Sequence, residues 1–137
     1  MSEFGNILGD KSLNFSIRIY NLSRFLNDEK HEHRISDQIF RSGTSIGANL
    51  AEAQCAVSRN DFISKIYISL KEANETLYWL QLLYRVSLLR KDQYESLYAD
   101  CEELKKLLVS ITKSTRNCNN NPNENFSSLD SKLFINS

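Results

Sequence analysis

Turn-forming residues are almost missing from the middle of the chain, and this constrains the fold more than any other feature. The only proline is Pro122, and Gly43 and Gly47 are the only glycines between residues 11 and 121. Proteins built from β-sheets need many tight turns, which are made mainly from glycine, proline and asparagine. A chain of 137 residues with this distribution therefore favours a few long helices.

Four stretches carry apolar residues at helical spacing, and they predict helices over residues 12–27, 36–56, 58–87 and 91–116. We expect Ser36 to cap the second helix, and Ser58 with Asp61 to cap the third. The apolar faces are formed by Phe15, Ile19, Leu22 and Leu26; by Ile39, Gly43, Ile46, Leu50, Ala53 and Val57; by Ile63, Ile66, Leu70, Ala73, Leu77, Leu80 and Tyr84; and by Tyr94, Leu97, Cys101, Leu104, Leu108 and Ile111.

The spacing of these faces alternates between three and four residues, as in the seam of a helical bundle. We therefore predict an all-α protein, an up-down-up-down antiparallel four-helix bundle over residues 12–116. Residues 1–11 are expected to form a flexible N-terminus. The Asn- and Ser-rich segment 117–137 has no helical period and is expected to be disordered.

Composition excludes several classes of protein. The formal net charge is zero and the sequence pI is about 6.7, so no global charge attracts nucleic acid or an anionic membrane. Three cysteines without a CxxC spacing are typical of reduced thiols, and no secretory signal or membrane span is evident. We expect a cytoplasmic protein.

Catalytic and metal-binding patterns are not found. His31 and His33 both fall in a polar connection, and Glu52, Glu72 and Glu75 are not followed three residues later by the histidine that di-iron bundles require. No nucleophile motif or phosphate-binding glycine loop is present. We predict a non-enzymatic protein with no cofactor and no metal.

The third predicted helix carries more apolar surface than one seam needs. Phe62, Tyr67, Tyr78 and Trp79 lie outside the narrow stripe. A wide apolar face indicates burial against several neighbours or a subunit interface. We favour the interface, and with it a homo-oligomer.

Basic residues on the second and third helices suggest an alternative function. Arg34, Arg41, Arg59, Lys65 and Lys71 form a candidate ridge that would follow phosphates if an oligomer repeated it around an axis. The alternative is an accessory protein that binds RNA or single-stranded DNA.

Three segments carry a family resemblance: QIFRSGTSIGANLAEA, SRNDFISKIYISLKEANETLYWL, and the spacing to QYESL and CEELKKLL. They resemble the bacterial four-helix-bundle protein family. This family includes proteins encoded in intervening sequences of 23S ribosomal RNA genes, and it is related to the accessory variability determinants of diversity-generating retroelements. The resemblance covers roughly residues 11–115.

The resemblance implies a non-enzymatic bundle that assembles as a ring, a pentamer in described relatives. The variability determinants bind nucleic acid and a reverse transcriptase, which makes both of them candidate partners. Among the matching positions, Arg41, Ser45, Asn49 and Glu52 form a polar stripe that we interpret as an interhelix hydrogen-bond network. The chain departs from the strongly basic variability determinants in its neutral charge. It departs from the family in Arg90, where a capping Ser or Thr is usual.

Overall fold

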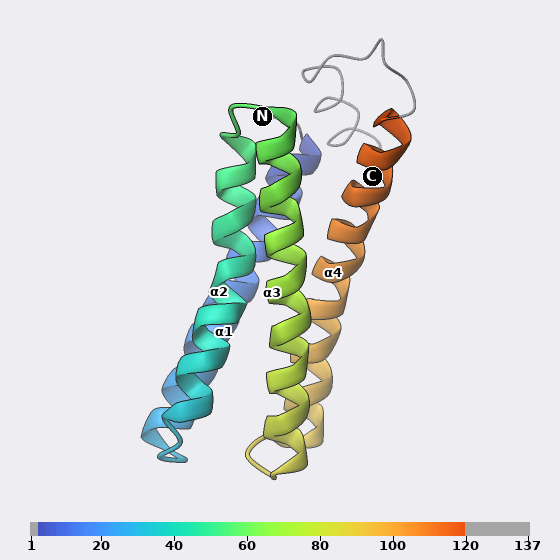
Figure 1. Ribbon diagram of the computed structural model, residues 1–137. Coiled ribbons are helices and arrows are strands. Elements are labelled where there is room, and N and C mark those ends of the chain that lie inside the picture. The colour runs from blue at the N-terminus through green and yellow to red at the C-terminus, as the bar shows by residue number, and fades with distance from the viewer. Residues whose placement is uncertain (1–2, 120–137) are drawn as a thin grey trace.

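The computed structural model describes residues 3–119, and these form four antiparallel helices (Figure 1). The helices are α1 (Glu3–Asp28), α2 (Arg34–Gln54), α3 (Arg59–Arg85) and α4 (Lys91–Asn119). Each helix packs along the next one in the sequence, and α1 packs less extensively against α4. This arrangement confirms the all-α class and is consistent with an up-down bundle. Within the described residues, no helix is long and apolar enough to cross a membrane.

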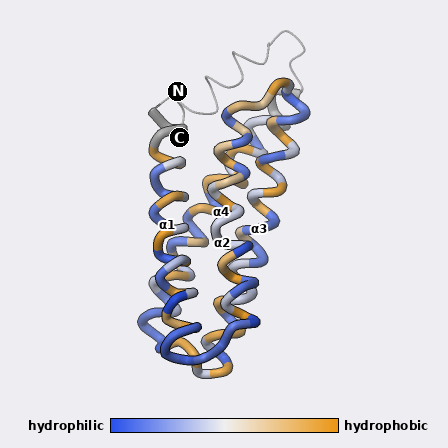
Figure 2. Tube along the Cα trace, turned by 90° about the vertical axis from the view of Figure 1, so that its left-hand side faces the viewer, coloured by the Kyte–Doolittle hydropathy of each residue, from blue (hydrophilic) through white to orange (hydrophobic). Residues whose placement is uncertain are grey.

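The core is formed by the predicted apolar faces. Figure 2 shows hydrophobic residues recurring along each helix. Phe15, Ile19, Ile46, Leu80 and Leu108 are all at most 2% exposed. Val57 is the clear exception, because it is 93% exposed. It lies in the connection after α2 has ended at Gln54, so the helical spacing that predicted its burial no longer applies.

The first helix begins earlier than predicted. It starts at Glu3, so most of the segment expected to be flexible is helical. The reason is that Leu8, Ser12, Phe15 and Ile19 continue one buried face at spacings of three and four. At the other end of the chain, α4 extends to Asn119, past the predicted start of the tail, and residues 120–137 lie outside the described part of the chain.

The start of α2 also differs from the prediction. Ser36 does not cap it, because the helix begins at Arg34 and Ser36 is completely buried. The side chain of Glu32 accepts the backbone N–H groups of Arg34 and Ile35, at 3.2 Å each. Ser36 instead lies 2.7 Å from Ser23, oxygen to oxygen, across the interface of α1 and α2.

Side-chain oxygen atoms cap the N-termini of α3 and α4. Ser58 accepts the backbone N–H of Asp61 at 3.1 Å, which confirms the predicted cap. Before α4, the side chain of Gln93 accepts the backbone N–H of Arg90 at 3.1 Å. This is one half of a capping box, and it compensates for the unfavourable Arg90.

The end of α3 is closed without glycine. Ser87 has a φ of 65°, and the N–H groups of Ser87 and Leu88 donate to the carbonyls of Tyr84 and Leu83 at 3.0 and 2.9 Å. These two bonds form a Schellman motif. Helix α3 therefore ends at Arg85, two residues before the predicted boundary.

Candidate functional site

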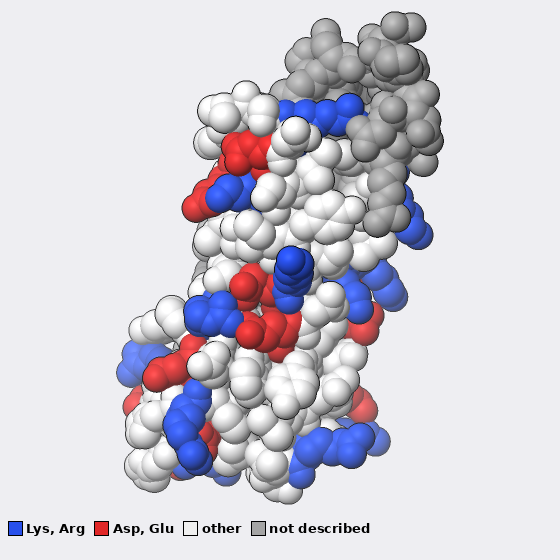
Figure 3. Space-filling model, in the orientation of Figure 1, with Lys and Arg blue, Asp and Glu red and all other residues white. Residues whose placement is uncertain are grey.

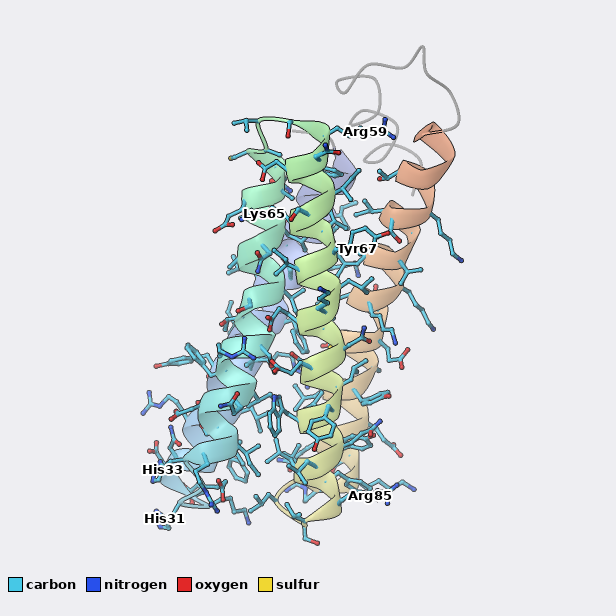
Figure 4. All side chains as sticks on the ribbon, in the orientation of Figure 1. His31, His33, Arg59, Lys65, Tyr67 and Arg85 are labelled. Carbon is cyan, nitrogen blue, oxygen red and sulfur yellow. The ribbon has the colours of Figure 1, made fainter. Side chains whose placement is uncertain are left out.

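The predicted basic ridge is spread along the molecule and is partly neutralised. Figure 4 places Arg59 and Lys65 in the first half of α3, while Arg34 begins α2 at the opposite end of the bundle. On the face shown in Figure 3, basic and acidic side chains adjoin one another and no large area of one sign is formed. The five residues therefore do not make one continuous cationic surface.

Arg41 is held by two carboxylates of the neighbouring helix. Its guanidinium donates to both oxygens of Glu72, at 3.3 and 3.1 Å, and also to Glu75. The Arg41 side chain is 49% exposed, so the pair contributes modestly to stability. Its stronger effect is on binding, because a phosphate at this position would have to compete with two glutamates already in place.

Lys65 is paired in the same way. Its ammonium group lies 2.8 Å from Glu52 of α2. The hydrogen bond to Glu52 and the charge of that carboxylate raise the pKa of Lys65. Lys71 is exposed and has no ion pair within the described part of the chain.

Arg59 and Arg34 serve local structure. Arg59 donates to the backbone carbonyl of Thr115 at 3.1 Å and so ties the start of α3 to α4. Arg34 lies 3.9 Å from Glu32, and its side chain is 94% exposed. Neither contact brings these arginines near Arg41 or Lys65.

The predicted polar network is not one network. Ser45 donates to the carbonyl of Arg41 at 2.5 Å, and Asn49 donates to the carbonyl of Ser45 at 2.8 Å. Both bonds stay within α2, four residues back along the helix. The contacts that join α2 to α3 are instead the ion pairs of Arg41 and of Glu52. The side chains of Ser45 and Asn49 instead bond to carbonyl groups of their own helix.

The expected interface on α3 is largely interior. Phe62 is 1% exposed, so it cannot form a surface contact. Trp79 is half-buried against the core, and Tyr67 is half-buried and points toward α4 (Figure 4). Tyr78 alone of the four is well exposed, at 60%. The wide apolar face arises because α3 packs between α2 and α4 and so needs two buried sides.

Four of the eight large apolar side chains that are exposed in the described part of the chain lie on α1, where sequence reasoning did not place an exposed face. Leu13, Ile17 and Tyr20 are 61%, 51% and 49% exposed, and Phe40 of α2 is 41% exposed. The first three recur at spacings of four and three on the side of α1 away from the core. The signal was visible in the sequence as a second apolar stripe on a helix that already had a buried one.

Two other candidate chemistries receive no support from the geometry. His33 lies 2.9 Å from Asn27 through its Nδ1 atom, and no group of three metal-ligating side chains is present among the described residues. Cys101 is fully buried, and burial raises the pKa of its thiol to about 12. The reactive thiolate is therefore suppressed at neutral pH.

Comparison with known proteins gives the family. The model of the 23S rRNA-intervening sequence protein family matches residues 6–110, which is most of the chain. The chain belongs to this family. No curated protein with a similar sequence was found.

A solved structure supports the same assignment. It is the crystal structure of a protein of unknown function from the S23 ribosomal protein family of Bacteroides thetaiotaomicron. It is 56% identical over 80% of this chain and 97% of its own length, with a TM-score of 0.78. The predicted family is thereby confirmed.

Proposed function

We propose that this member of the 23S rRNA-intervening sequence protein family is a non-enzymatic, self-associating scaffold. The observation that carries the proposal is the exposure of Leu13, Ile17 and Tyr20 on the outer side of α1. Three large apolar side chains in one row are an unfavourable surface for an isolated bundle, and such rows are typical of interfaces.

The remaining chemistry of the bundle fits a scaffold. Arg41 and Lys65 bind glutamates of the neighbouring helix, and the buried Cys101 thiol is held in its neutral form. These polar groups stabilise the bundle rather than converge on a hollow where a substrate would react. The resemblance implies a ring of five copies, and we include that ring in the proposal.

The mass of the protein in solution tests self-association directly. We expect light scattering after size-exclusion chromatography to give several times the 15.8 kDa of one chain at micromolar concentration. A monomer across the whole accessible concentration range would overturn the proposal. Far-UV circular dichroism of the same samples establishes that the helices are intact.

A second candidate function is binding of nucleic acid, and one hollow favours it. At the end of the bundle where α3 joins α4, a cavity of about 570 Å³ is lined by Lys30, Arg85 and Arg90, with Phe25 and Tyr84 among its apolar walls. Cations beside aromatic rings are a common arrangement for binding phosphates and bases. Asp92 partly neutralises this group of cations, because its carboxylate accepts a hydrogen bond from Arg90 at 3.2 Å.

Fluorescence anisotropy with labelled RNA and single-stranded DNA, each at low and physiological salt, tests this candidate. Binding should weaken steeply as salt rises, and Lys30→Glu with Arg85→Glu should weaken it more than Lys113→Glu, an exposed control on α4. Equal loss in both variants would mean that the hollow is not the binding site. A protein partner such as a reverse transcriptase, which the resemblance implies, becomes the next candidate if neither nucleic acid binds.

A further inference from the structure

Two cavities adjoin at the end of the bundle where α3 joins α4. The first, which we call the end hollow, is the cavity of about 570 Å³ that Lys30, Arg85 and Arg90 line. The second, the side hollow, has a volume of about 290 Å³ and lies between α1 and α4. Phe25 and Leu89 line both of them. Small-molecule sites usually have volumes of roughly 300–1,000 Å³, so the two hollows together have the size of such a site.

The end hollow is cationic, although the chain as a whole is neutral. Three cations line it, and no carboxylate does so in the described part of the chain. Arg90 is paired with Asp92, whereas Lys30 and Arg85 form no ion pair with any described residue. Figure 4 places Arg85 at the same end of the bundle as the connection after α1, and Lys30 belongs to that connection. Two unpaired cations favour a multiply charged anion such as a phosphate over a single carboxylate.

The helix ends at this site add to the attraction for an anion. Helix α4 begins at Lys91, and the partial positive charge of a helix N-terminus favours a phosphate nearby. The opposite partial charge at the end of α3 is reduced, because its last carbonyls accept hydrogen bonds. Those of Leu83 and Tyr84 bind the N–H groups of Leu88 and Ser87. Backbone and side chains therefore favour the same kind of ligand.

The side hollow has a different chemistry. Four side chains form its apolar walls: Leu22, Phe25, Leu89 and Leu97. Two amides, those of Asn21 and Gln93, also line it, and Arg18 beside them is bound to Asp100 at 2.5 Å. The Gln93 oxygen accepts the N–H of Arg90, which leaves its amide nitrogen to donate. Amides between apolar walls suit the polar edge of a heteroaromatic base, whereas a hydrocarbon chain would leave them unpaired.

Aromatic contacts hold the walls of both hollows in place. The ammonium group of Lys30 lies 5.7 Å from the centre of the Phe25 ring, so this cation stays beside the wall that the hollows share. Tyr84 of the end hollow stacks on Tyr94, with ring centres 4.6 Å apart and planes inclined by 10°. Walls that are fixed before a ligand arrives reduce the entropy lost on binding.

We propose that the two hollows together bind one nucleotide. Its phosphate would lie in the end hollow beside Lys30 and Arg85. Its base would lie in the side hollow against Phe25, with its edge toward the amides of Asn21 and Gln93. A nucleotide joins a multiply charged anion to a flat polar ring, and the shared wall lets one molecule occupy both hollows. The ligand is either a free nucleoside 5′-phosphate or the 5′-phosphorylated end of a strand.

This inference rests on the second candidate function, because it assigns the ligand of the same hollow. It also makes that function specific, since two adjoining cavities of this size hold one nucleotide rather than a length of strand. It does not depend on how many chains associate.

Isothermal titration calorimetry of the full chain tests the proposal with the four nucleoside 5′-monophosphates. Inorganic phosphate and the matching nucleosides serve as the two separate parts of each ligand. We expect at least one nucleotide to bind at least about tenfold more tightly than either of its parts, because it alone fills both hollows. Equal affinity for inorganic phosphate and every nucleotide would reduce the site to a cationic surface and overturn the inference. Absence of nucleotide binding up to millimolar concentration would also overturn it.

Two variants address the two hollows separately. Arg85→Glu should weaken binding of nucleotides and of inorganic phosphate alike, by at least about tenfold, while Lys113→Glu at an exposed position of α4 should change neither. Asn21→Ala should weaken nucleotide binding by about two- to tenfold without affecting inorganic phosphate. Its control is Asn74→Ala, which removes an exposed amide from α3. Unchanged nucleotide affinity and unchanged preference among bases in Asn21→Ala would contradict the placement of the base.

Competition identifies the source of the nucleotide. If the hollows take the end of a strand, a short oligonucleotide with a 5′-phosphate should displace a bound nucleotide, and the same oligonucleotide with a 5′-hydroxyl should not. If neither displaces it, the ligand is the free nucleotide. Strand binding in the anisotropy experiment without any nucleotide binding would overturn this inference and leave the second candidate function standing. Nucleotide binding without strand binding would give the reverse result.

Discussion

Gly43 of α2 lies directly against Ile19 of α1, so closely that a Cβ atom added to the glycine would be 2.8 Å from Ile19 Cγ1 and 2.9 Å from Cγ2. Ile19 is fully buried and β-branched, so it has little freedom to move aside. This contact sets how closely α1 and α2 approach each other.

We predict that Gly43→Ala destabilises the bundle. Alanine gains up to about 1 kcal/mol of helix propensity over glycine, but overpacking a close-packed core costs about 1–3 kcal/mol. The expected net loss is about 1 kcal/mol or more, measured by urea unfolding followed by circular dichroism. Gly47→Ala is the matched control, because its added Cβ would first meet the Ser12 hydroxyl oxygen at 3.2 Å. An equal change in both variants would contradict the role given to Ile19.

Gly9 offers the opposite prediction. It lies within α1, and an added Cβ would meet nothing within 4 Å. Gly9→Ala should therefore stabilise the protein by about 0.5–1 kcal/mol through helix propensity alone. An increase in the urea midpoint without a change in slope would support this account, and a decrease would mean that residue 9 is not helical in solution.

Ser23 and Ser36 form a buried polar contact between α1 and α2. Their hydroxyl oxygens are 2.7 Å apart, and Ser36 also lies 3.1 Å from the carbonyl oxygen of Ser23. Ser36→Ala leaves the Ser23 hydroxyl without this partner, so we expect a loss of about 1–2 kcal/mol. Removing both hydroxyls should cost less than the sum of the single changes, and additive losses in a double-mutant cycle would show that the two serines do not interact.

The buried thiol of Cys101 should make the stability of the fold depend on pH in the alkaline range. Burial raises the pKa of its thiol from 9.0 to about 12, so the folded protein keeps a proton that the unfolded chain loses. The stability from the neutral thiol is complete below pH 9 and falls as pH rises toward 12, by at most about 1.4 kcal/mol per pH unit.

The measurement compares wild type with Cys101→Ala, in which this part of the pH dependence should disappear while that of tyrosine and lysine remains. Peptide mapping after alkylation at pH 8 should show modification of the exposed Cys55 and protection of Cys101. Rapid alkylation of Cys101 in the folded protein would mean that its site opens readily.

The fold class could be predicted because it depends on local periodicity. The rows Phe15–Ile19–Leu22–Leu26 and Ile39–Gly43–Ile46–Leu50 lie in the core as expected, since a helix brings every third and fourth residue to one side whatever surrounds it. Helix ends were less accurate. Serine is a favourable capping residue, but Ser36 is buried and bonds to Ser23 of α1 instead. The side chain of Glu32 caps the helix in its place.

The candidate site was harder to predict because it depends on contacts between helices. Which charges remain free depends on residues from another helix. Arg41 and Lys65 have opposite charges beside them only because the packing of α2 against α3 brings Glu72, Glu75 and Glu52 close to them.

The sequence by itself determined the four helices and their buried faces, because these follow from spacing along one chain. Only the tertiary structure decided that α3 is covered on two sides and that α1 carries the exposed apolar row, because exposure depends on which neighbour each face meets.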